Sequence, residues 1–299
     1  MGKLTREQFE NMLISGNVVE TFNTLTKAEL TQMIGADVAA MVGFDQKNSH
    51  HCYNLFMHSL KAVESISPQG LTAEQFKTLR VAAFFHDIAK PQVASFNPKT
   101  KQQVFYGHAE KSVEVATPIL SDLGYSEAEI NKLGFLIGHH DDFISYRTNL
   151  EPFQFNHLFI RKISELTIAE KMIENAYDFE AMGYSEEQIK GILFSLIQNK
   201  QPFFKVKTGR YEFNVNMQEV KSKMASGKFS RPFTPTLSDY KMLLELCKAD
   251  SLSQSEVAMQ DGKVVGTKQE KMERNHLIES LLPKAYEIFM NFCPNKEIK

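Results

Sequence analysis

Apolar residues recur at helical spacing along most of this chain. Between residues 51 and 66, for example, Cys52, Leu55, Phe56 and Val63 lie three, four or seven positions apart, the period of an amphipathic helix. Similar reasoning predicts helices at 5–14, 26–42, 51–66, 73–89, 108–122, 237–251 and 267–292. The helix at 73–89 is expected to stop before Pro91, and residues 91–107 to form a loop.

Two similar segments, GYSEAEI from Gly124 and GYSEEQI from Gly183, carry Ser followed three residues later by Glu or Gln. This is a capping box, so we interpret the similarity as two helices with the same start and not as an internal repeat. The period changes to two at residues 203–215, which predicts a β-hairpin turning at Thr208–Gly209. A second turn is predicted at Asp261–Gly262. The fold class is therefore all-α with a small β-hairpin insertion.

Composition says more about the size and cellular location of the protein than about its chemistry. The 299 residues suffice for one large or two small domains, and a net charge of -2 argues against bulk polyanion binding. The three cysteines are far apart, so a disulfide framework is not expected. With no apparent signal peptide and no apolar run of about 20 residues, we expect a cytoplasmic protein without a membrane segment.

Ionisable residues interrupt the most apolar helices. The run 81–89 is Val-Ala-Ala-Phe-Phe-His-Asp-Ile-Ala, where an ionised Asp87 would be costly without a cation nearby. Asp250 continues the apolar stripe of Leu243 and Cys247, and His58 lies at inward spacing on its own helix. A single buried histidine is more often a satisfied core residue than a ligand. Recurrence on several helices favours a shared metal site of mixed nitrogen and oxygen ligands.

The order of these residues resembles the HD phosphohydrolase superfamily. His58, the pair His86–Asp87 in FFHDIAKP and Asp250 in LLELCKADS match its H…HD…D metal ligands. KNSHHCYNLFMHSL and FYGHAEKS resemble the HD portion of tRNA nucleotidyltransferases, although no nucleotidyltransferase catalytic pattern precedes them. The resemblance implies an HD-domain helical bundle with one or two divalent ions (Mn, Fe, Co, Ni or Mg).

The resemblance also implies further site residues. His108 and His139, with His140 as a further candidate, correspond to histidines that hold a second ion, and Asp87 would bridge the two ions. Lys90 would act with Asp87 in catalysis by neutralising a phosphate oxygen. An equally good interpretation makes Lys90 a lysine at a helix C-terminus that interacts with the helix dipole.

The interval before Asp250 is long, which predicts an insertion at 146–236 between two parts of the HD domain, 46–145 and 237–299, with N-terminal helices at 1–45. From Lys200 to Arg231 the insertion has eight basic and two acidic residues, interleaved with aromatics, a composition suited to phosphates and stacked bases. Lys205, Lys207 and Arg210, with Arg147, are candidate substrate contacts. A solvated hairpin face would explain the lysines equally well.

We therefore expect a metal-dependent phosphodiesterase acting on a nucleotide or a phosphate derived from nucleic acid. The substrate classes are a cyclic nucleotide, a cyclic oligonucleotide or a 2′,3′-cyclic phosphate. Two alternatives stay open: a nucleotide phosphomonoesterase, and a non-catalytic RNA-binding helical module.

Overall fold

A computed structural model describes residues 2–47, 51–144, 163–198, 203–208, 211–254, 257–260 and 263–292. The chain divides into two compact units, one made of Met1–Ser145 with Ser238–His276, the other of Tyr146–Leu237 with Leu277–Lys299. Residues 277–299 thus group with the segment predicted as an insertion, whereas the sequence had assigned them to the HD domain.

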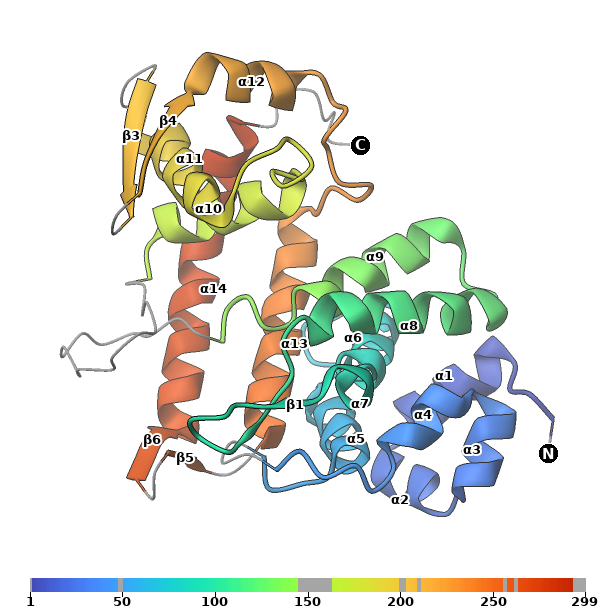
Figure 1. The fold of residues 1–299 in the computed structure, drawn as a ribbon. Helices are drawn as coiled ribbons and strands as arrows, with labels where there is room; N and C mark the ends of the chain where they lie inside the picture. Colours follow the sequence, from blue (N-terminus) through green and yellow to red (C-terminus); the bar gives the residue numbers. More distant parts are fainter. Residues whose placement is uncertain are drawn as a thin grey trace. The chain divides into compact units, whose positions relative to one another are not determined.

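The first unit is mainly helical (Figure 1). Its elements are α1 (Arg6–Ile14), α2 (Val18–Asn23), α3 (Lys27–Met33), α4 (Ala36–Met41), α5 (Leu55–Ser65), α6 (Ala73–Phe85), α7 (Lys90–Val93), β1 (Ser95–Phe96), β2 (Gln103–Val104), α8 (His108–Asp122), α9 (Glu127–Gly138), α13 (Leu237–Gln254), β5 (Val257–Gln260) and β6 (Lys263–Thr267). The start of α14 (Lys268–Met290) also belongs to it. The helix expected at 26–42 is two helices, and the loop expected at 91–107 contains the short hairpin β1–β2.

The helix expected at 73–89 ends earlier, and the prediction for its last four residues was wrong. Helix α6 stops at Phe85, and residues 86–89 form turns before α7 begins. A continuous helix would bring the ring of Pro91 against the carbonyl four residues earlier, that of Asp87. In the structure Pro91 instead lies in the first turn of α7, where proline is well tolerated. His86 and Asp87 are therefore turn residues.

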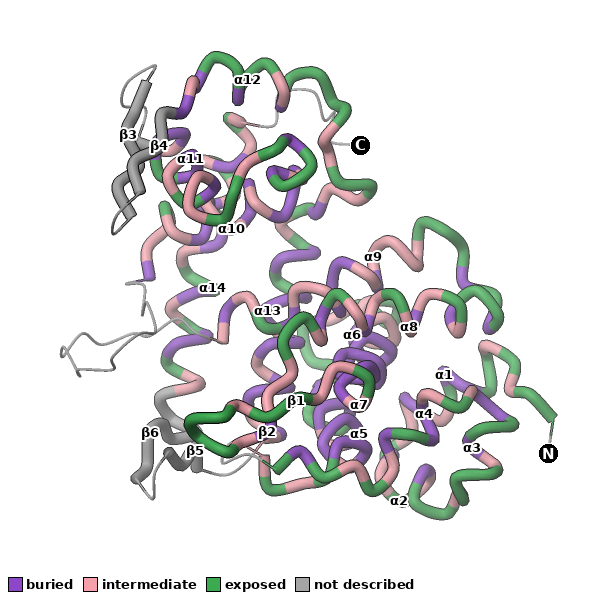
Figure 2. Tube along the Cα trace, in the orientation of Figure 1, coloured by how far each residue is buried: buried purple, intermediate pink, exposed green. Residues whose placement is uncertain are grey.

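The core of the first unit is built around α5 and α6. Phe84 is fully buried, and its ring contacts those of Phe9, Phe22, Phe56 and Phe85 at centroid distances of 5.0–6.3 Å. Burying one such side chain contributes about 1.5–3 kcal/mol. Figure 2 shows buried stretches along both helices. The turn at 86–89 directly follows the buried end of α6 in this core.

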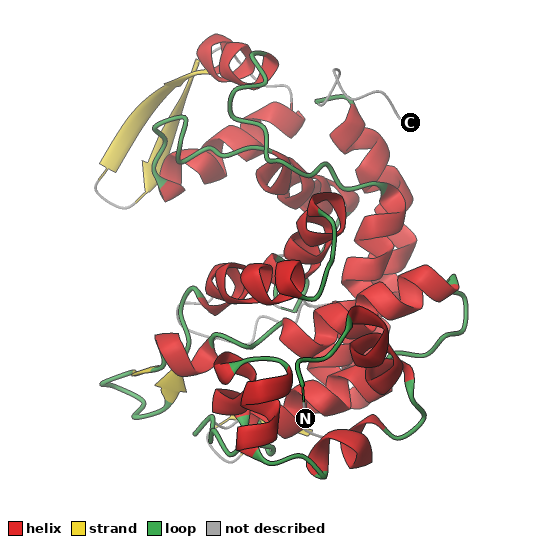
Figure 3. Cartoon of the chain, turned by 90° about the vertical axis from the view of Figure 1, so that its right-hand side faces the viewer, coloured by secondary structure: helices red, strands yellow, loops and turns green. Residues whose placement is uncertain are grey.

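The second unit consists of α10 (Glu165–Ala176), α11 (Glu186–Gln198), β3 (Phe203–Thr208), β4 (Tyr211–Asn216), α12 (Met217–Ala225) and the rest of α14. Strands β3 and β4 pair in antiparallel fashion with Thr208 opposite Tyr211, which confirms the predicted hairpin (Figure 3). Ser185 and Gln188 exchange the two capping-box hydrogen bonds at the start of α11. Among the helices described, none combines the length and hydropathy that a bilayer crossing requires.

Candidate metal centre

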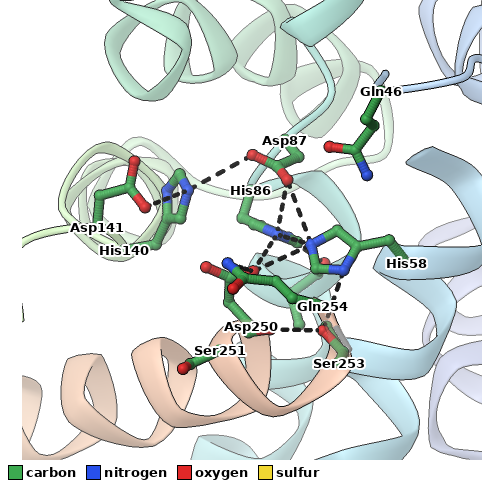
Figure 4. Close-up of polar contacts among 12 residues, drawn as sticks. Gln46, His58, His86, Asp87, His140, Asp141, Asp250, Ser251, Ser253 and Gln254 are labelled. Atoms are coloured by element: carbon green, nitrogen blue, oxygen red, sulfur yellow. Dashed lines mark hydrogen bonds and ion pairs between the residues drawn. The ribbon is translucent and has the colours of Figure 1, made fainter. Parts of the chain in front are cut away.

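Four side chains from three elements converge in the core of the first unit. His58 comes from α5, His86 and Asp87 from the turn after α6, and Asp250 from α13 (Figure 4). One ligand atom of each lies within 4.8 Å of the others, and all four residues are buried. The Nε2 atom of His58 is 3.2 Å from Nε2 of His86 and 3.0 Å from Oδ1 of Asp250. The structure thus brings together the four residues expected to hold the first ion.

A second group of donors lies on the other side of Asp87. Asp87 Oδ1 is 3.2 Å from Nε2 of His108 and 3.5 Å from Nε2 of His140, and those two nitrogens are 3.2 Å apart. Asp87 Oδ2 faces the first group instead, 3.2 Å from Nε2 of His86. Asp87 is therefore shared by both groups, as a bridging carboxylate would be.

Three of the histidines are oriented in the same way. The Nδ1 atoms of His86, His108 and His140 lie 2.8, 2.9 and 2.7 Å from the carbonyl oxygens three residues earlier, at Ala83, Phe105 and Ile137. A carbonyl only accepts, so each Nδ1 carries the proton and donates it. In the neutral ring Nε2 then holds a lone pair, which is the form that binds a metal.

His58 reaches the same tautomer through a hydroxyl. Ser253 Oγ donates its proton to the carbonyl oxygen of Asp250 at 2.8 Å, so it accepts from His58 Nδ1 at 3.1 Å. The lone pairs of His58 and His86 therefore face one another, an arrangement that repels unless a cation or a proton lies between them. The donor set fits a divalent metal ion with mixed imidazole and carboxylate ligands.

The charges of the group support this assignment. Burial disfavours the charged form of His86, but Asp87 and Asp250 outweigh it and raise the pKa of His86 to about 10. Burial likewise opposes ionisation of the two carboxyl groups, yet the neighbouring histidines hold the pKa of Asp87 and of Asp250 well below the usual value. The site thus keeps two carboxylates ionised in the core, where they require a cation. Without a metal that charge is supplied by a proton on His86 and by the ammonium of Lys90, and a divalent ion would take the place of the proton.

The buried carboxylate of Asp87 needs a positive charge beside it. Both of its oxygens are buried and lack a hydrogen bond of good geometry, although Lys90 Nζ lies only 2.6 Å from Oδ2. Lys90 is itself buried and donates to Gln46 Oε1 at 3.1 Å. Lys90 therefore lies beside Asp87.

The adjacent histidines after α9 have different surroundings. The helix ends at Gly138, and hydrogen bonds from Asp142 N to His139 O and from Ile144 N to Asp141 O make turns with a three-residue spacing. His139 contacts Asp142, because its Nδ1 atom is 3.2 Å from Oδ2 of Asp142. The ring of His139 packs on Phe135. His140 points to Asp87. The second group thus contains His108 and His140, and His139 lies outside it.

The predicted substrate contacts lie beyond what the structure describes. Arg147 and Arg210 fall outside the described residues, as do the side chains of Lys205 and Lys207. Their role stays a prediction.

Comparison with known proteins bears on the same region. Residues 49–179 match the family model of the HD domain. The chain contains an HD domain. A CC-adding tRNA nucleotidyltransferase of Thermus thermophilus is 28% identical over 137 residues, which cover 46% of this chain and 31% of that protein. An A-adding tRNA nucleotidyltransferase of Deinococcus radiodurans is 25% identical over 135 residues, 45% of this chain and 30% of that protein. The HD-containing chain thus aligns with only about a third of each relative.

Sequence reasoning missed several residues of the HD domain site. Ser253, three residues after Asp250 on α13, continues the buried face, and that spacing was a usable signal. Gln46 and Ser112 gave none, because their contacts are tertiary. Ser112 on α8 accepts a hydrogen bond from Ala89 N at 3.2 Å and so holds the turn that carries His86 and Asp87.

Proposed function

We propose that this chain is a metal-dependent phosphodiesterase of nucleotide substrates. The single observation that carries the proposal is the convergence of buried imidazole Nε2 atoms on Asp87, with the Nδ1 atoms of His58, His86, His108 and His140 each held by an acceptor. A module that only binds has no use for so many ionisable groups fixed in its core.

The protein's own residues have distinct roles in this proposal. His58, His86, Asp87 and Asp250 would hold one ion, and Asp87, His108 and His140 a second. Bound divalent ions supply a Lewis acid for the phosphoryl oxygens and lower the pKa of a water to near neutrality.

Lys90 would complete the phosphate site. Its ammonium lies 2.6 Å from Asp87 Oδ2 and so orients the carboxylate. A phosphate oxygen arriving beside Asp87 would find this positive charge already positioned, and Gln46 holds the ammonium from the other side. Lys205, Lys207 and Arg210 of the basic insertion, with Arg147, stay candidate contacts for the rest of the nucleotide.

The candidate functions differ in the class of substrate that each would hydrolyse. A cyclic nucleotide, a cyclic oligonucleotide or a 2′,3′-cyclic end would be cleaved by a diesterase, and a nucleoside monophosphate by a monoesterase. Two donor groups that share one carboxylate favour the diester. An RNA-binding module would hydrolyse neither, and its affinity for RNA would survive chelation.

The test measures hydrolysis of bis-p-nitrophenyl phosphate and of p-nitrophenyl phosphate by the purified full chain with added manganese. We expect activity on the diester that Asp250→Asn lowers by at least about 100-fold, since it removes a ligand of the first ion. His276→Ala is the matched control, because His276 is exposed on α14 and outside the described donor groups. Equal rates for the wild type and Asp250→Asn would contradict the proposal.

A further inference from the structure

The second donor group has an acidic neighbour that the sequence did not single out. Asp141 follows His140 in the turn after α9, and its Oδ2 lies 3.2 Å from Nε2 of His108. Its Oδ1 is 3.7 Å from Nε2 of His140. Ligand atoms of His140, Asp141 and Asp250 also lie within 4.8 Å of one another. The Asp141 carboxylate thus lies beside both imidazoles of the second donor group.

The two imidazoles already point to this place. The His140 side chain is 1% exposed, and its Nδ1 proton is committed to Ile137 O. Its Nε2 lone pair is therefore aimed at the space between Asp87 and Asp141 (Figure 4). His108 is oriented by Phe105 O in the same way. Asp141 is the carboxylate within reach of both imidazoles.

The competing assignment gives this ligand position to His139. Its Nδ1 is engaged with Asp142 and its ring with Phe135, and it belongs to none of the donor groups found among the described residues. Asp141, by contrast, already contacts both His108 and His140.

The donor groups differ in their access to water. The side chains of His58, His86, Asp87 and Asp250 are at most 3% exposed. In the second group His108 is 14% and Asp141 50% exposed. An ion held partly by an exposed carboxylate exchanges with solvent more readily than one enclosed by four buried ligands.

We propose that Asp141 is the solvent-facing ligand of the second ion, which therefore binds more weakly than the first and is the ion met first by the substrate phosphate. This inference rests on the proposed function, since it assumes that the site holds divalent metal and receives a phosphate.

The test is equilibrium dialysis of the full chain against Mn²⁺, with metal counted by elemental analysis and the bound ions examined by electron paramagnetic resonance. For the wild type we expect two equivalents of different affinity and a spin-coupled signal from ions bridged by Asp87. Asp141→Asn should keep the tight equivalent, weaken the second by at least about tenfold, and give the signal of a single ion. His139→Ala should match the wild type.

Other outcomes separate the two proposals. Two equivalents of unchanged affinity in Asp141→Asn, or loss of the second equivalent in His139→Ala, would overturn the assignment of Asp141. A single equivalent in the wild type would overturn it as well, while the first site and the proposed function stand. No bound metal in the wild type would overturn both. Asp141→Glu, which keeps the carboxylate, should retain part of the second equivalent if Asp141 is a ligand, and its thermal unfolding shows whether the fold is intact.

Discussion

Each candidate metal-binding histidine is defined as much by the partner of its Nδ1 atom as by the position of its Nε2 atom. His58 would be one buried histidine among several if Ser253 did not accept its Nδ1 proton. That hydrogen bond fixes the ring orientation and the tautomer, and partners of this kind typically change metal affinity by about 10- to 100-fold. The geometry of the neighbours therefore sets the chemistry of the residue.

We expect Ser253→Ala to weaken binding of the first ion by about 10- to 100-fold, because His58 loses the acceptor that keeps its lone pair on Nε2. The measurement is a competition titration with a chelator of known affinity. Ser65→Ala is the control, since Ser65 lies on the same helix as His58 but bonds only Ala62 O. An unchanged affinity in Ser253→Ala would show that the hydroxyl does not orient His58.

At the scale of elements, α1 and α9 are joined by one charged cluster. Arg6 contacts Glu129 and Glu10, each at 2.7 Å, and its guanidinium lies 4.1 Å above the ring of Tyr125. The hydrogen bonds from Arg6 and Ser126 lower the pKa of Glu129 to about 2. Because α9 leads into the turn with His140, this cluster supports one end of the site.

The lowered pKa of Glu129 predicts the direction in which the free energy of unfolding changes with pH. Glu129 stays ionised in the folded protein while the unfolded chain takes up a proton near pH 4.5, so its contribution is present above that pH and is lost as pH falls toward 2. We expect Arg6→Gln to lower the free energy of unfolding by about 1 kcal/mol at pH 7, allowing for solvent screening. The difference from the wild type should shrink below pH 4.5.

Denaturant unfolding from pH 7 to pH 3 measures this difference. Lys3→Gln is the control, because Lys3 and Asp122 form a well-exposed pair that should contribute almost nothing. A difference for Arg6→Gln that grew on acidification would refute the assignment.

Sequence reasoning succeeded at this scale where local rules decide the outcome. The capping box at Ser126 and the hairpin at 203–215 follow from neighbours in the chain, and both are present. It failed at the end of α6, where the apolar run 81–89 continues the helical pattern although the helix stops at Phe85. Asp87 stood out because a charge in an apolar run needs a partner. That rule does not say which of two adjacent histidines faces inward, because His139 and His140 lie in turns and not in a helix.

At the scale of the whole molecule, the described donor groups all belong to the first compact unit. An ion that binds only the folded state stabilises it by about 2.7 kcal/mol at a concentration 100 times its dissociation constant. Removing metal should therefore destabilise this unit selectively, as buried carboxylates lose their counter-charge.

We expect chelation to lower the unfolding temperature of the wild type by roughly 5 °C or more, given about 2–4 °C per kcal/mol for domains of this size. Differential scanning calorimetry with and without EDTA measures the shift. If the two units unfold separately, only one transition should move. His276→Ala should show the same shift as the wild type. If EDTA leaves the unfolding temperature of the wild type unchanged, the protein holds no structural metal.

The central claim is that Asp87 bridges two ions in a hydrolytic site, and metal content tests it most directly. The measurement is elemental analysis of the wild type beside Asp87→Ala, both purified without added chelator. We predict close to two equivalents of a transition metal in the wild type and the loss of most of it in the variant, because Asp87 belongs to both donor groups. No tightly bound metal in either protein would contradict the claim and favour a helical binding module.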